Sequence, residues 1–112
     1  SSSSAASDVY KRQDMDFAKT SEFVDSEFEG RFVEPLSDFI RIPNLSPHYD
    51  QEFLTNGLIN QAIDYVINFA DSFKIPGLTH KVTLEEGKAP MLFLIYEGNG
   101  TKNIMLYGHL DK

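Results

Sequence analysis

Hydrophobic residues recur at steps of three and four over residues 21–41, and this period predicts an amphipathic helix. Pro35 lies inside the segment and should either kink the helix or begin its second half. The pair Ile42-Pro43 should end it, because a residue that precedes proline disfavours the helical conformation. The apolar positions are Phe28, Phe32, Leu36, Phe39 and Ile40, and the acidic residues expected to suit the positive end of the helix are Glu22, Asp25 and Glu27.

After a loop at residues 44–50, the same period predicts a second helix from about Leu54 or Gly57 to Phe73. Its apolar stripe consists of Ile59, Ala62, Ile63, Val66, Phe69, Ala70 and Phe73. Polar residues fall mainly outside this stripe, namely Asn60, Gln61, Asp64, Asn68 and Asp71. The pair Pro76-Gly77 marks the end of this region.

The pattern then changes to one typical of strands. Residues 78–85 alternate, with His80, Val82 and Leu84 on one side, which predicts a half-exposed strand at the edge of a sheet. Two continuous apolar runs follow at residues 91–96 and 104–107, and such runs are typical of strands covered on both faces. Two helices followed by about three strands indicate the start of an α/β layer structure.

The two ends of the chain differ from this pattern. Residues 1–16 are rich in serine and almost without apolar side chains, so we expect a disordered or artefactual leader there. Residues 17–112 are expected to form the folded part. Because the chain stops soon after its most apolar segment, the sequence also predicts that this part is truncated.

Composition narrows the range of functions. The 112 residues allow about one small hydrophobic core. Ten basic against 17 acidic residues give a net charge of −7, which argues against nucleic acid or an anionic membrane as a partner. No apolar run is long enough to span a bilayer, and the absence of cysteine fits a cytoplasmic location.

The segment that ends the chain carries the candidate chemistry. His109 and Asp111 follow Gly108, and residues two apart in an extended segment project to the same side. The carboxylate can therefore fix the tautomer of the imidazole and leave the other ring nitrogen for a metal ion. The alternative reading is an exposed loop with an incidental hydrogen bond.

Two stretches together resemble the zinc aminoacylase, carnosine dipeptidase and acetylornithine deacetylase family of metallopeptidases. LFLIYEGNGTKNIMLYGHLDK is similar to the family's signature, a hydrophobic strand that leads into Gly-His-x-Asp. IRIPNLSP, which ends the first predicted helix, looks like the family's Ile-Pro-Ser element, with Asn44 where serine is more usual. The resemblance covers roughly residues 28–112, and GHLDK is closest to the dipeptidase-like branch.

The resemblance implies the N-terminal portion of a helix-sheet-helix zinc-peptidase catalytic domain. The parent enzyme would hold two zinc ions, or manganese in their place, and cleave a dipeptide or an N-acyl amino acid through a metal-activated water. His109 would be a metal ligand, and Asp111 would be the catalytic-site aspartate that orients it. A homodimer is compatible with the family. The general base and the other ligands do not match any residue here, so we expect the 112 residues alone to be inactive.

The sequence also contains other candidate residues and is compatible with other classes of protein. Glu85-Glu86 precedes the His-x-Asp motif, whereas the family's glutamate pair follows it, and a solvated turn explains it better. We expect His48 on the surface of a loop and His80 partly buried on its strand. Related zinc aminopeptidases also use His-x-Asp. A different class stays open as well, a non-catalytic α/β module that binds a partner through exposed strand edges.

Overall fold

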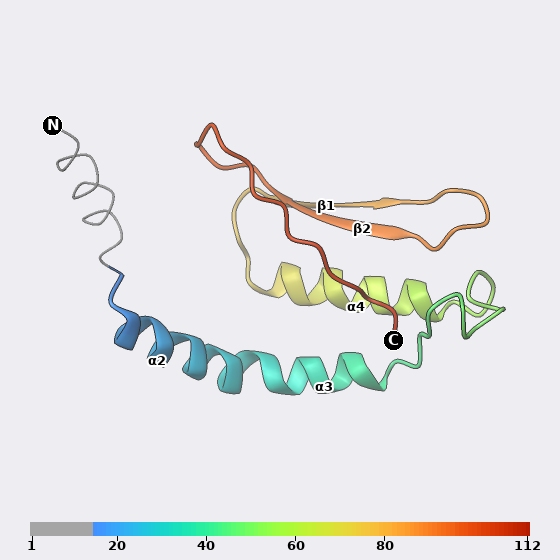
Figure 1. The fold of residues 1–112 in the computed structure, drawn as a ribbon, viewed down its shortest axis with the longest axis horizontal. Helices are drawn as coiled ribbons and strands as arrows, with labels where there is room; N and C mark the ends of the chain where they lie inside the picture. Colours follow the sequence, from blue (N-terminus) through green and yellow to red (C-terminus); the bar gives the residue numbers. More distant parts are fainter. Residues whose placement is uncertain (1–14) are drawn as a thin grey trace, which may run out of the picture. The chain divides into compact units, whose positions relative to one another are not determined.

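The computed structural model describes residues 15–112 and divides the chain into two units, Ser1–Glu34 and Pro35–Lys112. Its helices and strands are α2 (Phe17–Glu27), the π-helix η1 (Phe28–Phe32), α3 (Val33–Arg41), α4 (Leu58–Ser72), β1 (Leu78–Thr83) and β2 (Met91–Tyr96) (Figure 1). The leader predicted at residues 1–16 lies outside the described residues except for its last two. The chain thus combines helices with a sheet, as the α/β prediction requires.

Helix α2 begins at Phe17, earlier than the predicted start at residue 21. Asp16 is the reason, because it caps the helix with a side-chain oxygen that accepts the Lys19 N–H at 3.1 Å. The predicted role of Glu22 and its acidic neighbours at the helix start is therefore wrong. These residues lie beyond the first turn, where the helix dipole has little effect.

The predicted disturbance near Pro35 takes the form of a π-helical turn. The Val33 N–H donates to the Phe28 carbonyl, five residues back instead of four, and this bond closes the wide turn of η1. Pro35 lies three residues after the end of η1, and a proline in a helix lacks an N–H and crowds the carbonyl four residues before it. A widened turn just before the proline is one way to relieve that crowding.

Helix α4 follows the predicted pattern closely. Gly57 precedes it with φ 76°, a left-handed conformation that glycine adopts readily, and the Asn56 side chain accepts the Leu58 N–H at 3.0 Å. All seven residues of the predicted stripe are buried or partly buried, and the five polar residues assigned outside it are exposed. Three members of that stripe, Ile59, Ala62 and Ile63, form the core together with Ile42.

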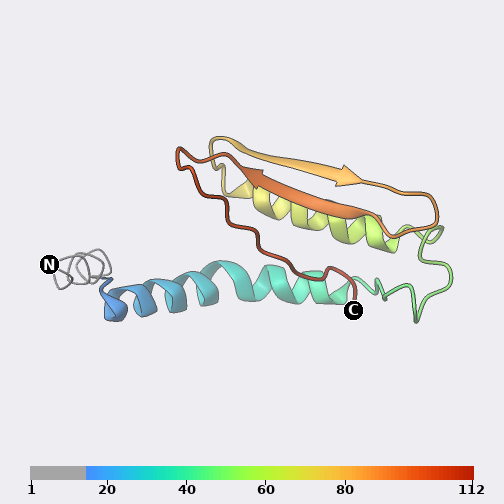
Figure 2. The same ribbon diagram turned by 45° about the horizontal axis from the view of Figure 1, so that its top comes forward.

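The two strands form an antiparallel hairpin that lies along one side of α4 in both views (Figures 1 and 2). Their register runs from Leu78 opposite Tyr96 to Thr83 opposite Met91. The strand predicted over residues 78–85 forms as far as Thr83. The predicted half-exposed pattern is wrong, because His80, Val82 and Leu84, which were placed together on one side, are all exposed. The predicted cover on both faces of β2 is wrong, because most of its apolar side chains are exposed.

The third predicted strand does not form within the described residues. Residues 104–107 lie outside the sheet, and their side chains are 82–92% exposed. A strand needs a neighbour that accepts and donates its backbone hydrogen bonds. The two strands present pair with each other, and the segment that follows β2 runs back toward the loop after α3 (Figure 2). No helix among residues 15–112 is both long and apolar enough to cross a membrane.

Candidate functional site

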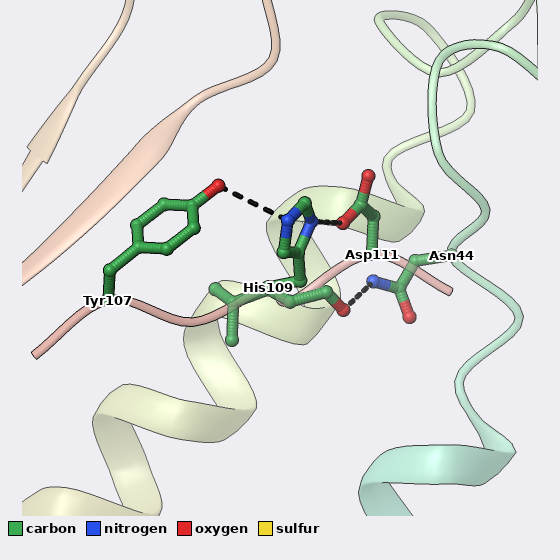
Figure 3. Close-up of polar contacts among 5 residues, drawn as sticks. Asn44, Tyr107, His109 and Asp111 are labelled. Carbon is green, nitrogen blue, oxygen red and sulfur yellow. Dashed lines mark hydrogen bonds and ion pairs between the residues drawn. The ribbon is translucent and has the colours of Figure 1, made fainter.

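Three side chains project from one side of the extended segment near the end of the chain. Tyr107, His109 and Asp111 alternate with Gly108 and Leu110, so the period of two that is typical of extended backbone places them in a row (Figure 3). Hydrogen bonds join the three side chains along this row. We refer to Tyr107, His109 and Asp111 as the imidazole row.

The predicted contact between His109 and Asp111 is confirmed. Nδ1 of the imidazole lies 2.9 Å from Oδ1 of the carboxylate (Figure 3). An ionised carboxylate only accepts hydrogen bonds, so the Nδ1–H donates and the ring adopts the Nδ1–H tautomer. Nε2 then keeps its lone pair, which is the form in which a histidine can bind a metal ion.

Nε2 has a partner that the sequence analysis missed. The hydroxyl of Tyr107 lies 3.2 Å from this nitrogen, and the two rings meet edge to face with centroids 5.5 Å apart. Because the Nδ1–H is already the donor of the neutral ring, the tyrosine O–H donates to Nε2. The same period of two that pointed to Asp111 places Tyr107 on the other side of His109 and could have revealed it.

The imidazole row is open to solvent on one side and supported on the other. The His109 side chain is 70% exposed, whereas that of Asp111 is 25% exposed. The ring of His109 is therefore accessible to solvent, while its Nε2 accepts the hydrogen bond from Tyr107. The Asp111 carboxylate is more buried than the ring that it contacts.

The backbone around Asp111 is anchored to the loop that follows α3. Asn44 is fully buried, and its side-chain Nδ2 donates to the Leu110 carbonyl at 2.8 Å (Figure 3). The Lys112 N–H donates to the Asn44 carbonyl at 3.1 Å, and the Ser46 N–H donates to the Lys112 carbonyl at 3.0 Å. The backbone of Lys112 thus bonds to Asn44 and Ser46, which lie two residues apart. Neighbouring parallel strands pair in this way.

The Lys112 side chain adds further contacts between the same two segments. Its ammonium donates to the Ile42 carbonyl at 2.6 Å and to the Asn44 Oδ1, and it lies 4.2 Å from the centroid of the Phe39 ring. Burial lowers the pKa of Lys112 below its ordinary value. We call residues Asn44, Ser46, Leu110 and Lys112 the Asn44 clasp.

The remaining candidate residues are exposed and have no hydrogen bond to the imidazole row among the described contacts. His48 is exposed and packs edge to face against Tyr49, and Glu85-Glu86 lies in an exposed turn where Glu85 pairs with Lys88, as predicted for both sites. His80 is also exposed and lies opposite Leu94 in the hairpin. Within residues 15–112, no group of three histidine, aspartate or glutamate side chains comes together as a metal site.

Comparison of the chain with protein-family models and with curated proteins gave no match. The resemblance to the zinc metallopeptidases therefore stays a prediction from the two sequence motifs.

Proposed function

We propose that His109 and Asp111 contribute one ligand and its orienting carboxylate to the zinc site of an amide hydrolase. The observation that supports this is the 2.9 Å contact between Nδ1 of His109 and Asp111, which leaves Nε2 unprotonated and able to bind a metal ion once the Tyr107 hydroxyl moves away. Metal-bound histidines commonly donate their second ring nitrogen to a carboxylate in this way. The substrate class that follows from the resemblance is a dipeptide or an N-acyl amino acid.

The residues present fit one ligand position and not a complete site. Zinc sites in proteins usually have three or four protein ligands. The described part of the chain brings together no group of three such ligands, so a working centre needs groups besides the imidazole row. Zinc bound there would supply a water of lowered pKa for attack on an amide carbonyl.

The chain's own residues have distinct tasks in this proposal. Asp111 holds the ring of His109 in one tautomer and one orientation. Tyr107 occupies the nitrogen that a metal would use, so its hydroxyl must move before binding. That movement is easy, because the side chain of Tyr107 is exposed and its single hydrogen bond is small in net free energy, about 1 kcal/mol or less.

The test is a zinc titration of the 112-residue chain, followed through the ring signals of its three histidines by NMR. We expect the signals of His109 to respond at the lowest zinc concentration, because only its ring has a carboxylate partner among the described histidines. His109→Ala should abolish this first step, and His48→Ala, which removes an exposed imidazole from a loop, should leave it unchanged. Equal responses from all three rings would contradict the proposal.

A second function is favoured by a specific observation, the open edges of the hairpin. The described sheet has two strands, so each has one edge without a partner strand, and the apolar side chains of residues 104–107 lie exposed after it. Unpaired edges recruit strands from other chains. In this alternative the chain is a non-catalytic binding module and the imidazole row is a surface loop.

The alternatives differ in a measurable way. A binding module should associate through the hairpin, and a charged residue at the exposed Phe93 should then weaken self-association or partner binding without changing the zinc response of His109. Phe93→Lys with an unchanged sedimentation profile would count against the module.

A further inference from the structure

Asp111 lies between two peptide units that are both held by one residue. The peptide bond before Asp111 carries the Leu110 carbonyl, which accepts from the Asn44 side chain at 2.8 Å. The peptide bond after Asp111 carries the Lys112 N–H, which donates to the Asn44 carbonyl at 3.1 Å. Because the planes on both sides of its Cα are fixed, the backbone dihedrals of Asp111 are fixed as well.

We infer that Asn44 is the positioning residue of the His109–Asp111 pair. Fixed backbone dihedrals set the direction of the Cα–Cβ bond of Asp111, and this direction brings the carboxylate within 2.9 Å of the His109 Nδ1. The hydrogen bonds of Asn44 to this segment go to Leu110 and Lys112 and to neither side chain of the pair. It acts on the imidazole only through the backbone of residues 110–112.

The chemistry of asparagine suits this task. Its amide provides a donor for the Leu110 carbonyl and an acceptor for the Lys112 ammonium at the same time. Asn44 itself is fully buried, so an unsatisfied polar group on its side chain would be costly. An aspartate of the same shape would lose the donor and set a negative oxygen against the Leu110 carbonyl.

The purpose assigned to the pair depends on the proposed function, but its geometry does not. The deciding experiment therefore measures the tautomer of His109 without metal, by long-range proton–nitrogen NMR of the imidazole rings. A Tyr107→Phe background leaves Asp111 as the ring's only hydrogen-bond partner found in the structure. In that background we expect the Nδ1–H form for His109.

Asn44→Asp should shift His109 away from the Nδ1–H form and toward the ring signals of exposed His48, while the amide signals of α4 stay in place. Asn99→Asp makes the same chemical change in an exposed loop and should leave the tautomer unchanged. A folded Asn44→Asp protein that keeps the Nδ1–H form would overturn the inference.

If Asn44→Asp does not fold, the wild-type chain decides the question. The scalar coupling across the bond from the Lys112 N–H to the Asn44 carbonyl should be detectable, and the Asn44 side-chain amide should exchange slowly with solvent. An undetectable coupling together with fast exchange in folded protein would also overturn the inference.

Zinc affinity is measured separately and should fall by roughly three- to tenfold in Asn44→Asp, less than the loss typical of a residue that touches the ligand. Tautomer control by Asn44 without zinc binding in the wild type would refute the proposed function alone.

Discussion

The hydroxyl of Tyr107 donates a hydrogen bond to Nε2 of His109 across 3.2 Å. This is the nitrogen that the His109–Asp111 contact leaves free for a metal ion. The tyrosine therefore competes with any metal for the ring, and the strength of that competition can be measured.

Tyr107→Phe should raise the zinc affinity of the chain by roughly two- to fivefold. The substitution removes the competing O–H and keeps the ring, and an exposed hydrogen bond has a net free energy of about 0.5–1 kcal/mol. The measurement is the zinc titration of His109 ring signals. Tyr49→Phe is the matched control, because Tyr49 is also exposed and also packs edge to face against a histidine. Unchanged affinity in Tyr107→Phe would show that the hydroxyl does not compete.

Asp111→Asn should lower the zinc affinity by roughly ten- to a hundredfold while the fold is kept. An amide has the size of the carboxylate but no charge to support the imidazole, and residues that orient metal-bound histidines typically have effects of this size. Circular dichroism checks the fold, and Asp71→Asn, an exposed site on α4, is the control. Full affinity in Asp111→Asn would remove the orienting role of this residue.

Ile63→Ala should lower the free energy of unfolding by about 2–4 kcal/mol, because Ile63 is 2% exposed in a core of few residues. Urea unfolding monitored by circular dichroism measures the change. The same substitution at Ile40, which is 59% exposed on α3, should cost less than about 1 kcal/mol. Similar losses in both variants would mean that the core described for α4 is not the stabilising one.

The Lys112 ammonium should make the stability of the chain depend on alkaline pH. Burial lowers the pKa of Lys112 below 10.5, so the unfolded chain binds more protons in the interval between the lowered pKa and 10.5. The free energy of unfolding therefore rises with pH across this interval. Comparison with Lys112→Met isolates the effect from tyrosines, which ordinarily titrate in the same range. A difference between the two proteins that falls with pH would reverse the assigned direction.

The 112-residue chain should not hydrolyse a dipeptide in the presence of zinc, because the described residues bring together no group of three metal ligands and the motif offers no general base. The measurement is release of free amino acids from a dipeptide, with His109→Ala as the background control. Turnover that depends on His109 would show that the chain carries a complete centre.

The sequence predicted best what local spacing determines. Every position of the stripe on α4 was predicted correctly, because the period of the helix places these side chains on one face and that face contacts the core. The contact between His109 and Asp111 was predictable for the same reason, since the period of an extended segment fixes which side chains are neighbours.

What the sequence did not reveal depends on distant partners. The apolar run at residues 104–107 looked like a buried strand, but an apolar run specifies no neighbour, and the hairpin strands pair with each other. Asn44 was noted only as an unusual residue in the Ile-Pro element. Its role is visible only in three dimensions, because its side-chain partner Leu110 lies 66 residues further along the chain.

That separation has a consequence for folding. Closing a loop of this length has an entropic cost that short-range contacts do not have, so the helices and the hairpin can form before Asn44 meets Leu110. The imidazole of His109 would then acquire its orientation in the last step, when the long loop closes. Early in refolding, the chain should already have its secondary structure while its histidine is still undirected.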